Sequence, residues 1–156
     1  MTQFVGEYEV PVDDKGRVFI PVELRRKLVP EAGDTFIIVR GLDGCLTAHP
    51  QNTWARIAQR MMELPQTEKR VRLFYRGILS QAAEARLDRQ GRVSINRKLL
   101  ERVGIGERMI IIGALDRLEL WDPETWTQYI AEADSNLEEV AETLTLNSPS
   151  DDGPQP

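Results

Sequence analysis

The sequence contains two copies of one nine-residue pattern, placed 75 positions apart. The copies occupy residues 12–20 and 87–95, and five of the nine positions are identical. After a two-residue deletion the match resumes and continues to a proline in each copy, Pro50 and Pro123. Two copies of about 40 residues are too few for a solenoid, in which three or more repeats usually stack. The repeat therefore predicts one domain with pseudo-twofold symmetry, built from a duplicated half.

Each half has the residue pattern of a small mixed unit. Period-two alternation of apolar and polar residues predicts strands, and two leucines one turn apart predict a short helix. Glycines and aspartates between these segments predict turns. The first half has strands at 7–12, 17–20, 35–39 and 45–48, a turn at 13–16 that makes the first two strands a hairpin, and a helix at 24–28 after Pro21. Residues 81–121 have the same pattern. We therefore predict a mainly β fold with helices (α+β), in which each β-β-α-β-β repeat is followed by a helix.

Domain boundaries follow from the same pattern. The apolar spacing of three and four residues after each of the two prolines predicts an amphipathic helix. The last ten residues contain three prolines and no large apolar side chain, which is typical of a disordered tail. The predicted segments are a first half at 1–50, a basic helical connector at 51–78, a second half at 79–123, an acidic amphipathic helix at 124–146 and a tail at 147–156.

The charge of the chain is unevenly distributed. With 20 Lys+Arg and 25 Asp+Glu the net charge is -5, which taken whole argues against nucleic acid as a partner. However, residues 127–156 hold seven acidic side chains and no basic ones, so residues 1–126 carry 20 basic and 18 acidic side chains. Residues 15–27 contain five basic side chains and one acidic one. The acidity therefore belongs to the C-terminal segment, and a locally basic surface remains in the first half.

The most informative motif is an aspartate followed four residues later by an arginine, with a glycine between them. It occurs as Asp13, Gly16 and Arg17, and again as Asp88, Gly91 and Arg92. A turn aspartate often accepts backbone N–H bonds and pairs with a nearby arginine, so a purely structural role is one explanation. The functional alternative is that the aspartate stiffens the turn and holds the arginine outward. An arginine held in this way can bind a phosphate or a guanine edge bidentately, and two-stranded β elements fit the major groove.

Further basic residues surround both turns, and the first turn has more of them. Lys15 stands where the second copy has Gln90, and the helix after the first copy carries two arginines. The expected DNA-binding residues are Lys15, Arg17, Arg25, Arg26, Arg89 and Arg92, and the expected turn-structuring residues are Asp13, Gly16, Asp88 and Gly91.

Catalytic and metal sites find little support. His49 is the only histidine and Cys45 the only cysteine, so neither a Ser-His-Asp triad nor a cysteine metal cluster can form in both halves. We expect Cys45 to be a buried thiol and His49 to lie at a strand end or on the surface. We expect no enzyme activity, no cofactor and no metal. No stretch approaches the about 18 apolar residues of a membrane-spanning helix, and residues 1–10 contain no signal core, so we expect a cytosolic protein.

Several of these motifs resemble, in order and spacing, the MraZ family of bacterial transcriptional regulators. They are Phe4-x-Gly6, Asp13-Asp14-Lys15-Gly16-Arg17, Gly41-Leu42-Asp43-Gly44-Cys45-Leu46, Arg72-Leu73-Phe74 and Asp88-Arg89-Gln90-Gly91-Arg92. The resemblance covers residues 1–144. Three positions of the second copy depart from the first: Gln81 replaces Gly6, Gln90 replaces Lys15 and Asn96 replaces Pro21.

The resemblance implies a pseudo-twofold β-barrel of the AbrB/MraZ swapped-hairpin superfamily, with both halves supplied by one chain. It also implies sequence-specific binding of double-stranded DNA at direct repeats in a promoter, control of the division and cell-wall gene cluster, and a nucleoid-associated homo-oligomer, most simply a ring. The Asp-x-x-x-Arg turns would be its DNA-contacting surface. The alternative is a protein-binding scaffold or antitoxin-like module that does not read DNA specifically.

Overall fold

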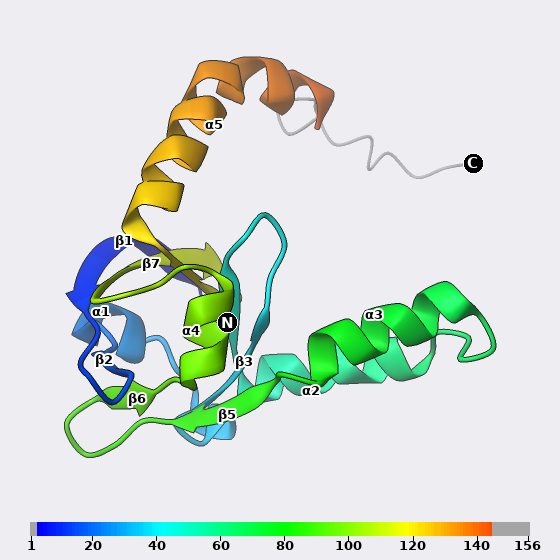
Figure 1. The fold of residues 1–156 in the computed structure, drawn as a ribbon, viewed down its shortest axis with the longest axis horizontal. Helices are drawn as coiled ribbons and strands as arrows, with labels where there is room; N and C mark the ends of the chain where they lie inside the picture. Colours follow the sequence, from blue (N-terminus) through cyan, green and yellow to red (C-terminus); the bar gives the residue numbers. More distant parts are fainter. Residues whose placement is uncertain (1–2, 145–156) are drawn as a thin grey trace, which may run out of the picture. The chain divides into compact units, whose positions relative to one another are not determined.

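The computed structural model describes residues 3–144 of the chain. The chain divides into two compact units, the first ending at Pro123 and the second beginning at Glu124. The first unit contains β1 (Phe4–Pro11), β2 (Arg17–Phe19), α1 (Val22–Arg25), the 3-10 turn η1 (Pro30–Ala32), β3 (Thr35–Arg40), β4 (Leu46–Pro50), α2 (Gln51–Met62), α3 (Lys69–Leu79), β5 (Ala83–Arg86), β6 (Arg92–Ser94), α4 (Arg97–Arg102), β7 (Arg108–Leu115) and β8 (Leu118–Trp121) (Figure 1). The predicted β-β-α-β-β order is confirmed in both halves, and the fold is α+β.

The strands form one large antiparallel sheet and one small one. The large sheet has the order β1-β7-β8-β4-β3-β5, and β2 pairs with β6 in a separate two-stranded ribbon. The described strands therefore form an open sheet with β1 and β5 at its edges. This differs from the closed barrel that the resemblance implied. The ribbon lies beside both edges, since β2 contacts β1 and β6 contacts β5. Because β2 and β6 pair only with each other, the ring of hydrogen bonds is interrupted on both sides of the ribbon.

The prediction of a hairpin between the first two strands is wrong. β1 pairs along its whole length with β7, from Phe4 opposite Leu115 to Pro11 opposite Arg108. β2 pairs with β6, with Val18 opposite Val93. The next residue after β1, Val12, donates its N–H to the Glu107 carbonyl at 2.8 Å, so the register with β7 continues one residue past β1, while Asp13 donates its N–H to the Arg17 carbonyl at 3.1 Å across the turn. Alternation identifies the buried face of a strand but not its partner, and here the partners lie in the other repeat.

The other two strands of each repeat do form hairpins. β3 pairs with β4 and β7 pairs with β8, both antiparallel. The β3–β4 connection closes with a hydrogen bond of 2.8 Å from the Gly41 N–H to the Cys45 carbonyl. Asp43 has a φ of 65° and Gly44 a φ of 88°, as the expected turn at 42–44 requires. Each repeat therefore supplies one self-contained hairpin and two strands that pair with the other repeat.

Equivalent positions of the two repeats fill a common core. The matched pairs are Val18 and Val93, Ile20 and Ile95, and Leu24 and Leu99, all at most 3% exposed. Because side chains alternate along a strand, burying Val18 and Val93 turns the residues on either side of them outward. The core therefore determines which face of the β2–β6 ribbon is exposed.

The two short helices that follow the ribbon begin differently. Pro21 is the N-cap of α1 and contributes no side-chain hydrogen bond. At the equivalent place Asn96 is the N-cap of α4, and its side-chain oxygen accepts the Lys98 N–H at 2.8 Å. The replacement of proline by asparagine thus exchanges a residue with fixed φ for one that caps the helix.

Helices α2 and α3 extend to one side of the sheet, away from β2 and β6 (Figure 1). The Tyr75 hydroxyl on α3 donates to the Met61 carbonyl on α2 and joins the two helices. Large apolar side chains on this pair remain exposed: Met62, Leu73, Phe74 and Leu79.

The second unit is described by α5 (Pro123–Thr143), which holds six acidic residues and no lysine or arginine. The predicted tail at 147–156 lies outside the described residues. Within residues 3–144, no helix combines the length and the apolar character needed to cross a membrane.

Candidate nucleic-acid interface

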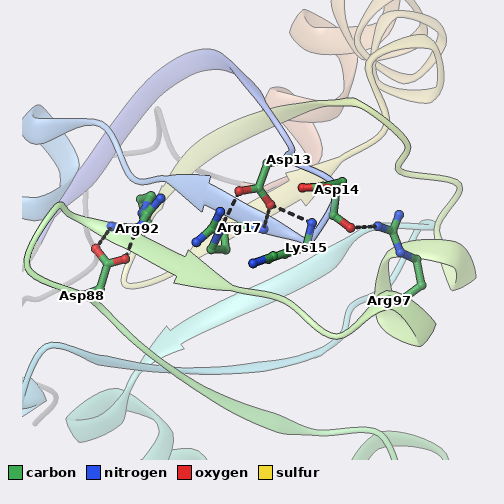
Figure 2. Close-up of polar contacts among 7 residues, drawn as sticks. All are labelled: Asp13, Asp14, Lys15, Arg17, Asp88, Arg92 and Arg97. Atoms are coloured by element: carbon green, nitrogen blue, oxygen red, sulfur yellow. Dashed lines mark hydrogen bonds and ion pairs between the residues drawn. The ribbon is translucent and has the colours of Figure 1, made fainter.

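The first Asp-x-x-x-Arg turn is organised by one carboxylate. Oδ1 of Asp13 accepts the backbone N–H of Lys15 at 2.9 Å and that of Arg17 at 2.8 Å, and Oδ2 accepts Nε–H of Arg17 at 2.7 Å (Figure 2). The Gly16 N–H closes the turn on the Asp13 carbonyl at 3.0 Å. An aspartate that binds backbone N–H groups two and four residues later stabilises a turn without help from a neighbouring strand. This is how the turn forms although β1 and β2 do not pair.

The second turn repeats this geometry. The Asp88 carboxylate accepts the N–H of Gln90 at 2.8 Å, the N–H of Arg92 at 2.9 Å and Nε–H of Arg92 at 2.9 Å. In both turns the backbone N–H of the arginine is the main cause that lowers the pKa of the aspartate below its usual value of 3.8. Both carboxylates are therefore ionised at neutral pH, and both arginines are held by a charge-assisted contact.

The way in which the aspartates hold the arginines leaves part of each guanidinium free for a ligand. The ion pairs use Nε in both cases, Arg17 to Asp13 and Arg92 to Asp88. Nε is the inner nitrogen of the guanidinium, so the two outer Nη groups are not used by the aspartate. The arginine side chains are 33% and 23% exposed. Each turn thus presents an anchored arginine whose outer donors have the spacing that binds a guanine edge or a phosphate.

Glycine is required in each turn because the other repeat lies close to it. Gly16 has a φ of 75°, and a Cβ there would lie 2.4 Å from the Ile95 carbonyl oxygen. Gly91 has a φ of 82°, and its Cβ would lie 2.6 Å from the Arg25 guanidinium carbon. The close approach carries hydrogen bonds in both directions, from the Ile95 N–H to the Gly16 carbonyl at 2.9 Å and from the Ile20 N–H to the Gly91 carbonyl at 3.0 Å. The two turns are therefore at opposite ends of one ribbon and are linked through it.

Arg25 lies beside the second turn, although the sequence suggested that it adds charge to the first. Its Nε donates to the Ile20 carbonyl at 2.7 Å, and its guanidinium covers Gly91. The equivalent residue in the other repeat is Leu100, whose side chain covers Gly16 instead. Arg26, the other expected residue, is exposed at the C-cap of α1.

Arg97 belongs to the same surface and was not among the residues expected from the sequence. It begins α4, and its Nη2 donates to the Asp14 carbonyl at 2.9 Å in the first turn, 83 residues away (Figure 2). Only the exchange of strands between repeats brings it beside the first turn, whereas the sequence alone associates this basic residue with the second copy. Each turn consequently receives an arginine from the helix of the opposite repeat. The first turn has Lys15, Arg17 and Arg97, and the second has Arg25, Arg89 and Arg92.

Cys45 and His49 lie outside this surface. Cys45 directly precedes β4, and His49 is in β4. Cys45 is 1% exposed, as expected, and burial raises the pKa of its thiol to about 12. His49 is 8% exposed, so it lies at the strand end and not on the surface. Its Nε2 lies 3.1 Å from Thr47 Oγ1, its ring packs against Trp54, and burial lowers its pKa to about 4. Within residues 3–144, no three or more His, Cys, Asp or Glu side chains lie close enough to hold a metal ion.

The buried histidine predicts a specific dependence of stability on pH. The pKa of His49 is 6.5 in the unfolded chain and about 4 in the folded protein, so the unfolded state binds more protons between these values. The free energy of unfolding should therefore fall as the pH decreases from 6.5 to 4, by about 3 kcal/mol from this residue. His49→Gln removes the titration. The free energy of unfolding of both proteins is measured with urea at pH 7, 5.5 and 4.5. The difference between the unmodified protein and His49→Gln should become smaller as the pH falls. A difference that stays the same at all three pH values would contradict the prediction.

The fold and the site define a class of protein: a duplicated α+β unit whose repeats exchange strands and present one aspartate-anchored arginine from each copy. A family model described as "MraZ protein, putative antitoxin-like" matches the chain twice, at residues 3–77 and 78–148. The chain belongs to the MraZ family, as the sequence motifs indicated.

Curated relatives that carry the name of this family match almost the whole chain. A protein of Heliobacterium modesticaldum named transcriptional regulator MraZ is 40% identical over 141 residues, which are 90% of this chain and 96% of the relative. Proteins with the same name from Limosilactobacillus reuteri and Halothermothrix orenii are 37% and 38% identical. They cover 92% and 90% of this chain, and 98% and 96% of the relatives.

Proposed function

We propose that this protein is a transcriptional regulator that binds double-stranded DNA through the β2–β6 ribbon and its two turns. The observation that carries the proposal is the Nε contact of Arg17 and Arg92, which holds each arginine and leaves its outer donors for a ligand. The name of the relatives, transcriptional regulator MraZ, supports the same function. We propose that its work is binding and not catalysis, and that it acts in the cytoplasm at the nucleoid.

In the proposed complex the ribbon enters the major groove with its outward face toward the bases. A two-stranded β-ribbon fits this groove, and an arginine there binds O6 and N7 of a guanine bidentately. Arg17 and Arg92 are the residues proposed to read bases. Lys15, Arg25, Arg26 and Arg89 are proposed to contact phosphates, together with Arg97. Asp13, Gly16, Asp88 and Gly91 hold the turns in the shape that these contacts need.

Two turns per chain provide few contacts, so we propose that binding depends on several copies. The two repeats would form a pseudo-twofold AbrB/MraZ-type barrel in which the β2–β6 ribbon joins the edges of the sheet. The exposed apolar side chains of α2 and α3 would pack against a neighbouring copy in a ring. Copies in a ring that meet direct repeats in a promoter gain avidity through effective concentration. The promoter proposed is that of the division and cell-wall gene cluster.

The proposal predicts a strong dependence of binding on salt. The probe is the DNA directly upstream of the protein's own gene, compared with the same fragment after its direct repeats are scrambled. The logarithm of the association constant should fall linearly with the logarithm of salt concentration, with a slope of about -0.9 for each phosphate contacted. Lys15→Gln, which gives the first turn the residue of the second, should make the slope less negative by about 0.9 per bound subunit. Binding measured by fluorescence anisotropy at several salt concentrations provides both slopes.

The alternative function is a protein-binding scaffold or antitoxin-like module, and the description of the family model includes the words "putative antitoxin-like". Equal, weak binding to the intact and scrambled fragments, together with a protein partner captured after nuclease treatment, would favour that alternative. A preference for intact repeats that is lost at high salt supports the regulator.

A further inference from the structure

The outward face of the β2–β6 ribbon consists of four side chains. Val18 and Val93 face each other in the core, so the residues on either side of them point outward. On this face Arg17 is opposite Ser94 and Phe19 is opposite Arg92. Arg17 and Arg92 are equivalent in the repeat, and so are Phe19 and Ser94. The two ends of the face therefore differ at one position, where the first copy has the aromatic ring of Phe19 and the second has the small hydroxyl of Ser94.

Phe19 is not part of the core. It is 48% exposed, while its neighbours Val18 and Ile20 are 1% and 2% exposed. The Arg92 guanidinium carbon lies 5.8 Å from the centre of the ring, within the range of a cation–π contact. Since Nε of this arginine is also bound to Asp88 at 2.9 Å, the ring rests against a side chain that is itself fixed. Phe19 is thus an exposed but positioned apolar group between the two arginines.

We propose that Phe19 is a specificity-determining residue that contacts the 5-methyl group of a thymine next to a guanine bound by Arg92. This inference rests on the proposed binding of DNA by the ribbon. In the major groove only thymine presents a methyl group, and phenylalanine is one of the side chains that contact it. Arg92 and Phe19 face each other across the ribbon, so they reach neighbouring base pairs. The Ser94 position has no apolar group, so the two ends of the ribbon read different bases.

The experiment removes the methyl group from the DNA and the ring from the protein. In the promoter fragment each thymine of one direct repeat is replaced, one at a time, by deoxyuridine, which differs from thymidine only in that methyl group. Loss of one buried methyl should weaken binding of the unmodified protein about three- to five-fold at one or two positions. Phe19→Ser, which copies the second repeat, should bind the intact fragment more weakly and show no further loss with deoxyuridine. Phe19→Leu should keep part of the discrimination.

Leu42→Ser is the matched control. Leu42 is a 78% exposed apolar residue in the β3–β4 turn, and its removal should leave the deoxyuridine profile unchanged. Thermal unfolding and the molecular mass in solution are measured for each variant, because a half-exposed phenylalanine could instead support subunit contacts.

The proposal is wrong if every deoxyuridine fragment binds the unmodified protein as tightly as the intact one. It is also wrong if Phe19→Ser keeps the same profile, or if it changes only the molecular mass. All three results leave specific DNA binding in place, so they overturn the role of Phe19 alone. Equal binding to intact and scrambled repeats would overturn the proposed function as well.

Discussion

Replacing Arg17 by alanine is expected to abolish specific binding of the promoter fragment while the fold and the molecular mass in solution stay unchanged. The substitution removes the guanidinium whose Nε is anchored on Asp13 at 2.7 Å. The two backbone N–H bonds of the Asp13 carboxylate remain, so the turn should keep its shape. A bidentate arginine–guanine contact contributes about 1–3 kcal/mol, which is a loss of about 5- to 150-fold per bound subunit. In the proposed complex of several copies on repeated sites, these losses multiply. Fluorescence anisotropy on intact and scrambled repeats measures the loss of binding. Circular dichroism and the molecular mass in solution check that the fold and the assembly are unchanged.

Two further variants show what the arginine contributes. Arg17→Lys keeps the positive charge, but one ammonium group cannot pair with Asp13 and bind a guanine edge in the arginine geometry. It should therefore lose most of the preference for intact repeats. Arg76→Ala removes a charge from α3, an exposed position on the helices that extend away from the ribbon (Figure 1), and should keep that preference. Unchanged binding by Arg17→Ala would refute the proposed role of this turn.

Replacing Gly16 by alanine should cause a large loss of both stability and DNA binding. The new Cβ would lie 2.4 Å from the Ile95 carbonyl oxygen, a backbone atom that cannot move without breaking the ribbon. The φ of 75° is also unfavourable for alanine. A left-handed conformation costs about 1–2 kcal/mol and overpacking typically adds about 1–3 kcal/mol, so the free energy of unfolding should fall by about 2–5 kcal/mol. Urea unfolding monitored by circular dichroism measures this quantity.

Two other glycines separate the causes of that loss. Gly44 has a φ of 88° with open space around it, so Gly44→Ala should show only the backbone cost, about 1–2 kcal/mol. Gly91→Ala would meet the end of the Arg25 side chain, which can swing away. Gly91→Ala should therefore lower the free energy of unfolding less than Gly16→Ala does, but it should weaken DNA binding. If Gly16→Ala and Gly44→Ala lose equal stability, the close approach of the repeats at Gly16 contributes nothing.

The sequence was sufficient to predict the order of the strands and helices and the contact within each turn. The alternation around Val18, the leucine at Leu24 and the duplicated glycines predicted the strands, helices and turns, and the structure has them in that order. The aspartate and arginine of each turn are only four residues apart, so their contact also follows from local geometry.

The partners of the strands could not be predicted in the same way. Nothing in the pattern of β1 distinguishes β2 from β7 as its neighbour, and the structure selects β7. The positions of Arg25 and Arg97 depend on the pairing of β2 with β6, since each lies beside the turn of the other repeat. The role argued for Phe19 also needs the pairing with β6, which places it opposite Arg92. Long-range pairing therefore determines how the basic surface is assembled from residues that the sequence already contained.

The exchange of strands also has a consequence for how the chain is made. Residues 4–19 find their hydrogen-bonding partners at 92–115, so the N-terminal strands remain unpaired while roughly the next hundred residues are synthesised. At about 5–20 residues per second this delay lasts about 5–20 s, during which β3 can already pair with β4 and then with β5. Contacts this distant in sequence also slow folding in general. The basic surface can therefore form only after Arg97 has been synthesised, 83 residues after the Asp14 carbonyl that it binds.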